Sequence, residues 1–148
     1  MGTEFLTFAS NGETMLLETK GEVCPHTALT KLVGGSVEAL VLPTKEFSGK
    51  QITLFFDENK EDWRANMFGT ALARLAFRAA GDTREEEIML HGTVVAAHEY
   101  ITDEGDSVFE VIPDELMTVV QKLAESMLKA NDELEDKLKY LKKVSENN

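Results

Sequence analysis

The four arginines of this chain, Arg64, Arg74, Arg78 and Arg84, all lie between residues 64 and 84. A guanidinium group offers a planar fork of donors that fits the oxygens of a phosphate. Arg74 and Arg78 are four residues apart, so they share one face of a helix. In a chain of net charge −12, this concentration predicts a site for a small anionic ligand such as a nucleotide. We expect the site to include Asn59, Trp63, Arg64, Asn66, Thr70, Arg74 and Arg78.

Trp63 and two asparagines add recognition groups to this hypothesis. The indole face of Trp63 could stack on a base, and the side-chain amides of Asn59 and Asn66 could hydrogen-bond to it. The alternative is that the arginines form solvated ion pairs with Asp62 or with the acidic run at 85–87. Such exposed pairs contribute little free energy. The sequence leaves both interpretations open.

No other group of residues in the sequence indicates catalysis. His91 and His98 are seven residues apart, which places them on opposite faces of a regular strand, and the spacing typical of a structural zinc site is absent. Cys24 has no neighbour that would stabilise a thiolate. Glu18 and Glu38 could form a carboxylate pair for acid–base work, but exposed strand faces are the simpler interpretation. We therefore expect no catalytic residue, no metal and no cofactor, and a protein that is not an enzyme.

The elements that position these residues are expected to form an α+β fold, with a mainly antiparallel sheet, two short helices and a long C-terminal helix. Asn11-Gly12 between two β-rich runs predicts a tight hairpin. Gly34-Gly35 ends a helix that opens at Pro25. Strands are predicted at 4–9, 14–19, 37–42, 52–56, 87–100 and 107–112, and helices at 25–33, 66–80 and 113–144.

The C-terminal helix is the most strongly patterned segment of the chain, and its apolar residues recur at steps of three and four. About 32 helical residues span roughly 48 Å, whereas the 112 residues before them would form a body roughly 35 Å across. The helix should therefore overhang the body unless it folds back onto its own subunit. We expect an α+β body at 1–112 and an amphipathic oligomerisation helix at 113–148. Its apolar stripe comprises Leu116, Val120, Leu123, Met127, Ala130, Leu134, Leu138 and Leu141.

Charge and composition exclude several classes of protein. With 27 acidic and 15 basic residues, the chain is not expected to bind nucleic acid directly, because such binding needs clustered lysine and arginine. It is also not expected to bind anionic membranes. A single cysteine and the lack of a signal peptide predict a cytoplasmic protein, in the host cytoplasm if the protein is viral.

Short motifs between residues 28 and 97 carry a family resemblance. A helix ending in Gly34-Gly35 is followed by Val37-Glu38, and Asp57-Glu58-Asn59 forms an acidic-Asn turn. Further matches are Asn66 with Thr70-Ala71-Leu72, and the segment 88–95 around Gly92. This pattern resembles a small phage- and plasmid-borne family catalogued as domain of unknown function 3846. The resemblance implies a viral or mobile-element origin and no established reaction. The segment 61–64 and the charged run 84–87 depart from the pattern.

Two functional hypotheses follow. The first is a non-enzymatic, phage-type accessory protein that forms a homo-oligomer through its C-terminal helices and sequesters a small anionic ligand to evade host defence. The second is an acidic interaction protein, or DNA mimic, that inhibits a host protein through its carboxylates. The acidic residues that would form such a surface are Asp57, Glu58, Glu61 and Asp62, the run at 85–87, and Asp103, Glu104 and Asp106.

Overall fold

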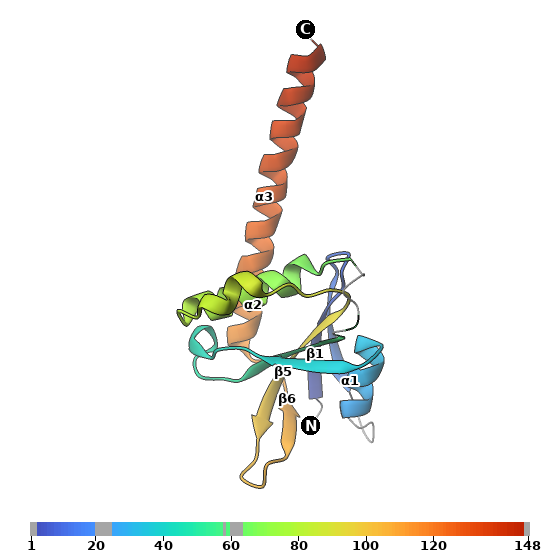
Figure 1. Cartoon of the computed structure of the whole chain (residues 1–148), viewed down its shortest axis with the longest axis vertical. Coiled ribbons are helices and arrows are strands. Elements are labelled where there is room, and N and C mark those ends of the chain that lie inside the picture. Colours follow the sequence, from blue (N-terminus) through green and yellow to red (C-terminus); the bar gives the residue numbers. More distant parts are fainter. Residues whose placement is uncertain (1–2, 20–24, 58, 60–63, 147–148) are drawn as a thin grey trace.

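The computed structural model describes residues 3–19, 25–57, 59 and 64–146, and within them the chain forms an α+β fold with one antiparallel sheet (Figure 1). The strand order is β2-β1-β5-β4-β3, and β6 pairs with β5. The strands are β1 (Thr3–Phe8), β2 (Thr14–Thr19), β3 (Val37–Val41), β4 (Ile52–Asp57), β5 (Val94–Ile101) and β6 (Ser107–Glu110). The helices are α1 (Pro25–Val33), α2 (Met67–Ala79) and α3 (Asp114–Glu146), with short 3₁₀ helices η1 (Lys45–Phe47) and η2 (Thr83–Glu87).

The sheet separates two hydrophobic clusters, because alternate residues of a strand point to opposite faces. In the central strand β5, Val94 and Ala96 belong to the cluster beneath α2 and the start of α3. Val95 and Ala97 belong to the cluster beneath α1. The first four residues of β5, 94–97, are fully buried on both faces, so this half of the strand is a continuous apolar run rather than an alternating one.

The predicted strand 87–100 is wrong in its first half. Only Val94–Ile101 form β5, and the preceding residues run beside the start of α2. There the backbone amide of Asn66 donates to the carbonyl oxygen of Leu90 at 2.7 Å. The backbone amide of Gly92 donates to the carbonyl oxygen of Arg64 at 3.1 Å. Gly92 has φ +71, which turns the chain into β5. Local backbone pairing with the segment before α2 thus replaces the predicted extension of the strand.

The first half of α3 belongs to the body of the protein. Leu116, Val119 and Val120 are buried in the core, and Leu123 and Met127 pack against it in part. Four of the residues expected to contact a partner, Leu116, Val120, Leu123 and Met127, are therefore used inside the protomer. The free part of the helix begins near residue 128 rather than at residue 113.

The second half of α3 projects away from the body as a straight rod (Figure 1). Leu134 is 54% exposed and Leu138 is 56% exposed, so the helix does not fold back onto its own subunit. The expected overhang is therefore present. Ala130 is exposed as well, and the side chain of Leu141 lies outside the described residues.

Candidate functional site

The base of the free helix is surrounded by pockets. Three of them are lined by α3 together with α2, the β1–β2 turn or η1. The pocket between α2 and α3 contains the candidate anion site, and the pocket beside the β1–β2 turn is apolar.

The pocket between α2 and α3 has a volume of about 230 Å³ and contains two of the four arginines. Arg74 and Arg78 lie one turn apart on one face of α2, as their spacing predicted. Leu123 of α3 forms the opposite wall. The volume is just below the range of about 300–1,000 Å³ typical of small-molecule sites, which favours a small anion over a whole nucleotide. The lining consists of Met67, Thr70, Ala71, Arg74, Leu75, Arg78 and Leu123.

Arg74 is held in place by the backbone beside it. Its Nε donates to the carbonyl oxygen of Ile88 at 2.9 Å, and the side chain is half-buried. Arg78 is exposed at the mouth of the same pocket. A fixed guanidinium next to an exposed one can bind an anion between them without first ordering both side chains, which lowers the entropy lost on binding.

The other two arginines lie outside this pocket. Arg84 forms a salt bridge with Asp82 at 2.8 Å and stacks over the ring of Phe77 at 5.2 Å. Two hydrogen-bonding interactions hold the pKa of Asp82 below its ordinary value. The larger is hydrogen bonding from the side chain of Arg84, and the next is the hydrogen bond from the backbone amide of Arg84. Arg84 therefore forms a solvated ion pair, as the alternative expected, but its partner is Asp82 rather than Asp62 or the acidic run at 85–87. Arg64 is exposed before α2 and is absent from the pocket lining.

Asn66, expected in the ligand site, is a structural residue. It is 1% exposed and caps α2 by accepting the amide of Gly69 at 2.8 Å. Its Nδ2 donates to the carbonyls of Phe8 and Gly92, both at 2.7 Å. The side-chain amide therefore joins β1, the turn before β5 and the start of α2, and it is almost completely removed from the surface.

Thr70 is committed to the fold in a similar way. Its hydroxyl accepts the amide of Leu90 at 2.9 Å and lies 3.5 Å from the carbonyl of the same residue. Asn59 is exposed in the turn after β4, where its backbone amide donates to Asp57. Trp63 lies outside the described residues. Of the seven predicted residues, Thr70, Arg74 and Arg78 line this one pocket. Asn59, Arg64 and Asn66 are not in its lining, and the prediction for Trp63 stays untested.

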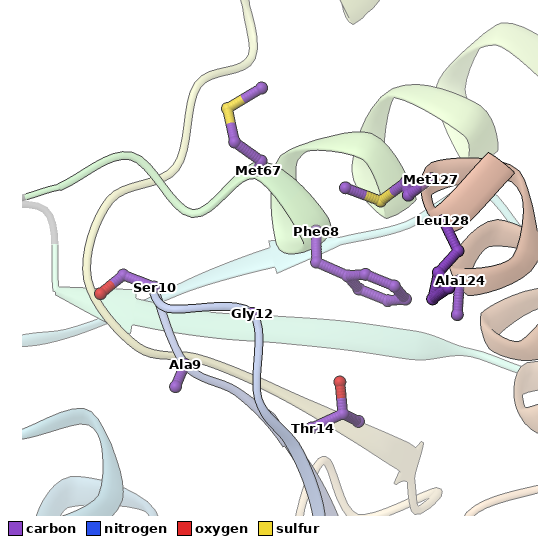
Figure 2. Close-up of a pocket in the computed structure, with 9 residues that line it drawn as sticks. All are labelled: Ala9, Ser10, Gly12, Thr14, Met67, Phe68, Ala124, Met127 and Leu128. Carbon is purple, nitrogen blue, oxygen red and sulfur yellow. The ribbon is translucent and has the colours of Figure 1, made fainter. Parts of the chain in front are cut away.

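The second pocket, also about 230 Å³, lies between the β1–β2 turn, the start of α2 and α3 (Figure 2). Its lining includes no charged residue. The ring of Phe68 points toward Ala124 and Leu128 of α3 (Figure 2). Met67 is 59% exposed and Leu128 is 62% exposed, so a patch of apolar surface lies open at the point where α3 leaves the body.

The remaining candidates for chemistry are dispersed by the fold. Glu18 lies on β2 and Glu38 on β3, the two opposite edges of the main sheet path, about 19 Å apart by strand spacing. The carboxylate pair therefore does not form. His98 lies in β5 whereas His91 precedes it, and no three potential metal ligands come together within the described part of the chain. Cys24 lies outside that part.

An ion pair between Lys50 and Glu115 joins α3 to the body. The two residues are 65 positions apart, so no local pattern in the sequence could predict the pair. Lys50 Nζ donates to both carboxylate oxygens of Glu115, at 2.7 and 2.8 Å. Hydrogen bonding from Lys50 is the largest cause that holds the pKa of Glu115 below its ordinary value. The hydrogen bond from the backbone amide of Glu115 is the next cause. The pair lies in the first turn of α3, where a carboxylate also complements the positive end of the helix dipole.

Comparisons with protein-family models, with curated proteins and with solved structures find no match to this chain. The resemblance of residues 28–97 to a phage-borne family therefore stays a prediction. Within the described residues, no helix has both the length and the apolar character that a membrane crossing requires.

Proposed function

We propose that this protein is a non-enzymatic accessory binding protein that works as a homo-oligomer assembled through the free half of α3. The observation that carries the proposal is the exposed leucine pair on that helix. Leu134 and Leu138 continue the same face that Leu116, Val120 and Met127 bury in the body. An apolar stripe exposed over several turns is typical of a protein–protein contact.

A second copy of the chain is the partner that the charge distribution favours. The segment 128–148 holds five acidic and five lysine residues, so it is neutral, whereas residues 1–127 carry the whole net charge of −12. Two acidic bodies repel each other, but two neutral rods approach without that cost. The rod is thus the region through which copies of this protein can associate.

The test of assembly is sedimentation analysis of the wild type and of the double variant Leu134→Asp/Leu138→Asp over a wide range of concentration. We expect the wild type to form an oligomer and the variant to sediment as a monomer with unchanged circular dichroism of its strands. A matched control, Thr118→Asp/Gln121→Asp, adds the same two charges at exposed positions outside the apolar stripe of α3 and should leave the oligomer intact. A monomeric wild type at high concentration contradicts the proposal.

For the ligand, we propose a small anion held by Arg74 and Arg78 in the pocket between α2 and α3. The shared pocket and the fixed geometry of Arg74 support this assignment. Inorganic phosphate and nucleoside phosphates are the probes, read out as thermal stabilisation. A ligand present at 100 times its Kd would stabilise the protein by about 2.7 kcal/mol.

The matched variants for ligand binding are Arg74→Ala/Arg78→Ala and Arg64→Ala/Arg84→Ala. Each pair removes two arginines, so the net charge changes equally. We expect only the first pair to abolish the stabilisation. Equal loss in both variants would point to non-specific charge, and no stabilisation of the wild type by any probe would remove the anion site from the proposal.

Sequestering such an anion in a host cytoplasm is the role that we propose for the assembled protein, on the strength of the phage-family resemblance. The acidic alternative, in which carboxylates bind a host protein, remains the competing outcome. Of its acidic clusters, the turn with Asp103, Glu104 and Asp106 is fully exposed between β5 and β6. Salt-sensitive binding of a host protein that is lost on changing these three to asparagine or glutamine, with no anion effect, would favour that alternative.

A further inference from the structure

The charges of the free helix are sorted into two consecutive blocks. Asp132, Glu133, Glu135 and Asp136 form an acidic block around Leu134. A lysine block follows at once with Lys137 and Lys139, both exposed, and the sequence continues with Lys142 and Lys143. No acidic residue lies between residues 137 and 143, and no lysine lies between 132 and 136. The helix is neutral overall but polarised along its length.

This order of charges distinguishes the two ways in which identical helices can pair. In a parallel pair in register, the acidic block of one copy lies beside the acidic block of the other, and the lysines face lysines. In an antiparallel pair that crosses near residue 137, each acidic block lies beside the partner's lysines. Like charges across a helix contact are unfavourable and opposite charges select the orientation.

The position of the body leads to the same orientation. The stripe face of α3 packs on its own body up to Met127, and Leu134 and Leu138 lie on that same face further along. A partner helix that lay parallel on this face would meet the body over the first half of α3. An antiparallel partner crossing at residue 137 places its residue 146 opposite residue 128, where the helix becomes free. The two free segments then overlap fully, and neither tip enters the other body.

We infer that two copies of this chain pair through antiparallel free segments of α3, with Leu134 and Leu138 of both copies packed around the crossing. The four leucines lie within about 5 Å of the crossing along the axis. The acidic block of each copy flanks the lysine block of the other. The two bodies are held at opposite ends of a shared rod. This inference rests on the proposed function, since it specifies the partner and the geometry of that assembly.

Charge pairing within a single helix is the simpler explanation of the blocks. Glu133 and Lys137, and likewise Glu135 and Lys139, are four residues apart in the favourable order. Such pairs stabilise an isolated helix by a few tenths of a kcal/mol each. They do not explain why the acids and lysines are segregated into two blocks, because alternating charges would form as many such pairs. Spectroscopy on the paired protein distinguishes the two explanations.

Spin labels at two exposed positions of α3 measure the orientation directly, in a Cys24→Ser background. Labels at Thr118→Cys lie 19 residues from the crossing and those at Ser126→Cys lie 11 residues away. At 1.5 Å per residue, the antiparallel pair predicts distances between the two copies of about 57 and 33 Å. The parallel pair predicts the same short distance at both positions, below about 30 Å, because helix axes lie about 8–10 Å apart.

Eight substitutions that exchange the two blocks test the role of charge without changing the net charge. The exchange variant carries D132K, E133K, E135K, D136K, K137E, K139E, K142E and K143E. In the antiparallel arrangement this variant pairs with itself and the wild type pairs with itself, but the two do not mix. In the parallel arrangement the mixed pair is preferred, because every acid then lies beside a lysine. Differently tagged copies, mixed and separated by affinity, report which pairs form.

The outcomes separate this inference from the proposed function. Long distances that differ by about 24 Å between the two labels, together with self-sorting, support the antiparallel pair. An oligomer with equal short distances, or with preferred mixed pairs, overturns the antiparallel geometry and leaves the proposed assembly standing. A monomer with no measurable distance overturns both.

Discussion

The body and the free half of α3 differ in how their leucines are used. Leu116 and Leu138 lie on the same face of one helix, yet Leu116 is fully buried and Leu138 is 56% exposed. The body also carries the net charge of −12, whereas the segment 128–148 is neutral. The same amphipathic pattern therefore serves a core at one end and an exposed surface at the other. Periodicity identifies an apolar face but not what covers it.

Truncating the two leucines gives the largest expected contrast. Leu116→Ala should lower the free energy of unfolding by about 2–5 kcal/mol, because it leaves a cavity in the core. Leu138→Ala should change it by less than about 0.5 kcal/mol in dilute solution, where no partner covers the side chain. Urea unfolding followed by circular dichroism measures both. Similar losses in the two variants at high dilution would show that Leu138 is covered within the protomer.

The two asparagines that the sequence assigns to a single ligand site, Asn59 and Asn66, provide the next contrast. Asn66→Ala removes the cap of α2 and leaves the amide of Gly69 and the carbonyls of Phe8 and Gly92 without their partner. We expect a loss of about 2–3 kcal/mol. Asn59→Ala, at an exposed position, should change stability by less than about 0.5 kcal/mol. Equal stability of the two variants would contradict the structural role of Asn66.

A smaller effect is expected for the threonine that fixes the segment before β5. Thr70→Val keeps the shape of the side chain but leaves the buried amide of Leu90 without an acceptor. The expected loss is about 1–3 kcal/mol, and Thr118→Val on the exposed face of α3 is the matched control. Hydrogen exchange at the amide of Leu90 should accelerate in the Thr70 variant alone. Unchanged exchange would mean that another group protects this amide.

The smallest effect concerns the ion pair between the body and α3. Lys50 holds the pKa of Glu115 below its ordinary value of 4.5, so the unfolded state takes up this proton first as the pH falls. The pair therefore stabilises the protein above pH 4.5, and its contribution is lost as the pH falls through the lowered pKa. Lys50→Met should be less stable than the wild type at pH 7, and the difference should shrink toward pH 3. Parallel pH curves for the two proteins would exclude this linkage.

Local signals predicted most of the elements. Asn11-Gly12 marked the β1–β2 hairpin, Gly34 with φ +80 ended α1, and the apolar period predicted both α2 and α3. The predicted strand before Val94 was wrong, because residues 88–93 pair with the segment that leads into α2 rather than with a neighbouring strand. A hydrophobic run indicates that a segment is buried, but not which backbone it pairs with.

The site was harder to predict than the fold, because a sequence pattern does not show which groups a side chain contacts. Arg74 and Arg78 were found because a helix brings residues four apart to one face. Asn66 hydrogen-bonds to buried backbone, and Thr70 does so while also lining the pocket. A sequence does not distinguish a polar side chain that bonds to buried backbone from one that binds a ligand. Met67 gave no signal, and Leu123 was predicted only as a residue of the apolar stripe, not as a wall of this pocket.

The sequence alone determined the α+β fold class, the length and face of the terminal helix, and the neutrality of its second half, because each depends on local spacing or on simple counts. Tertiary structure alone decided where that helix leaves the body. That point depends on how far the sheet and α2 extend beneath α3. Their extent is set by contacts between residues that are distant in the chain. The same contacts decided which arginines share a pocket and which asparagine is buried.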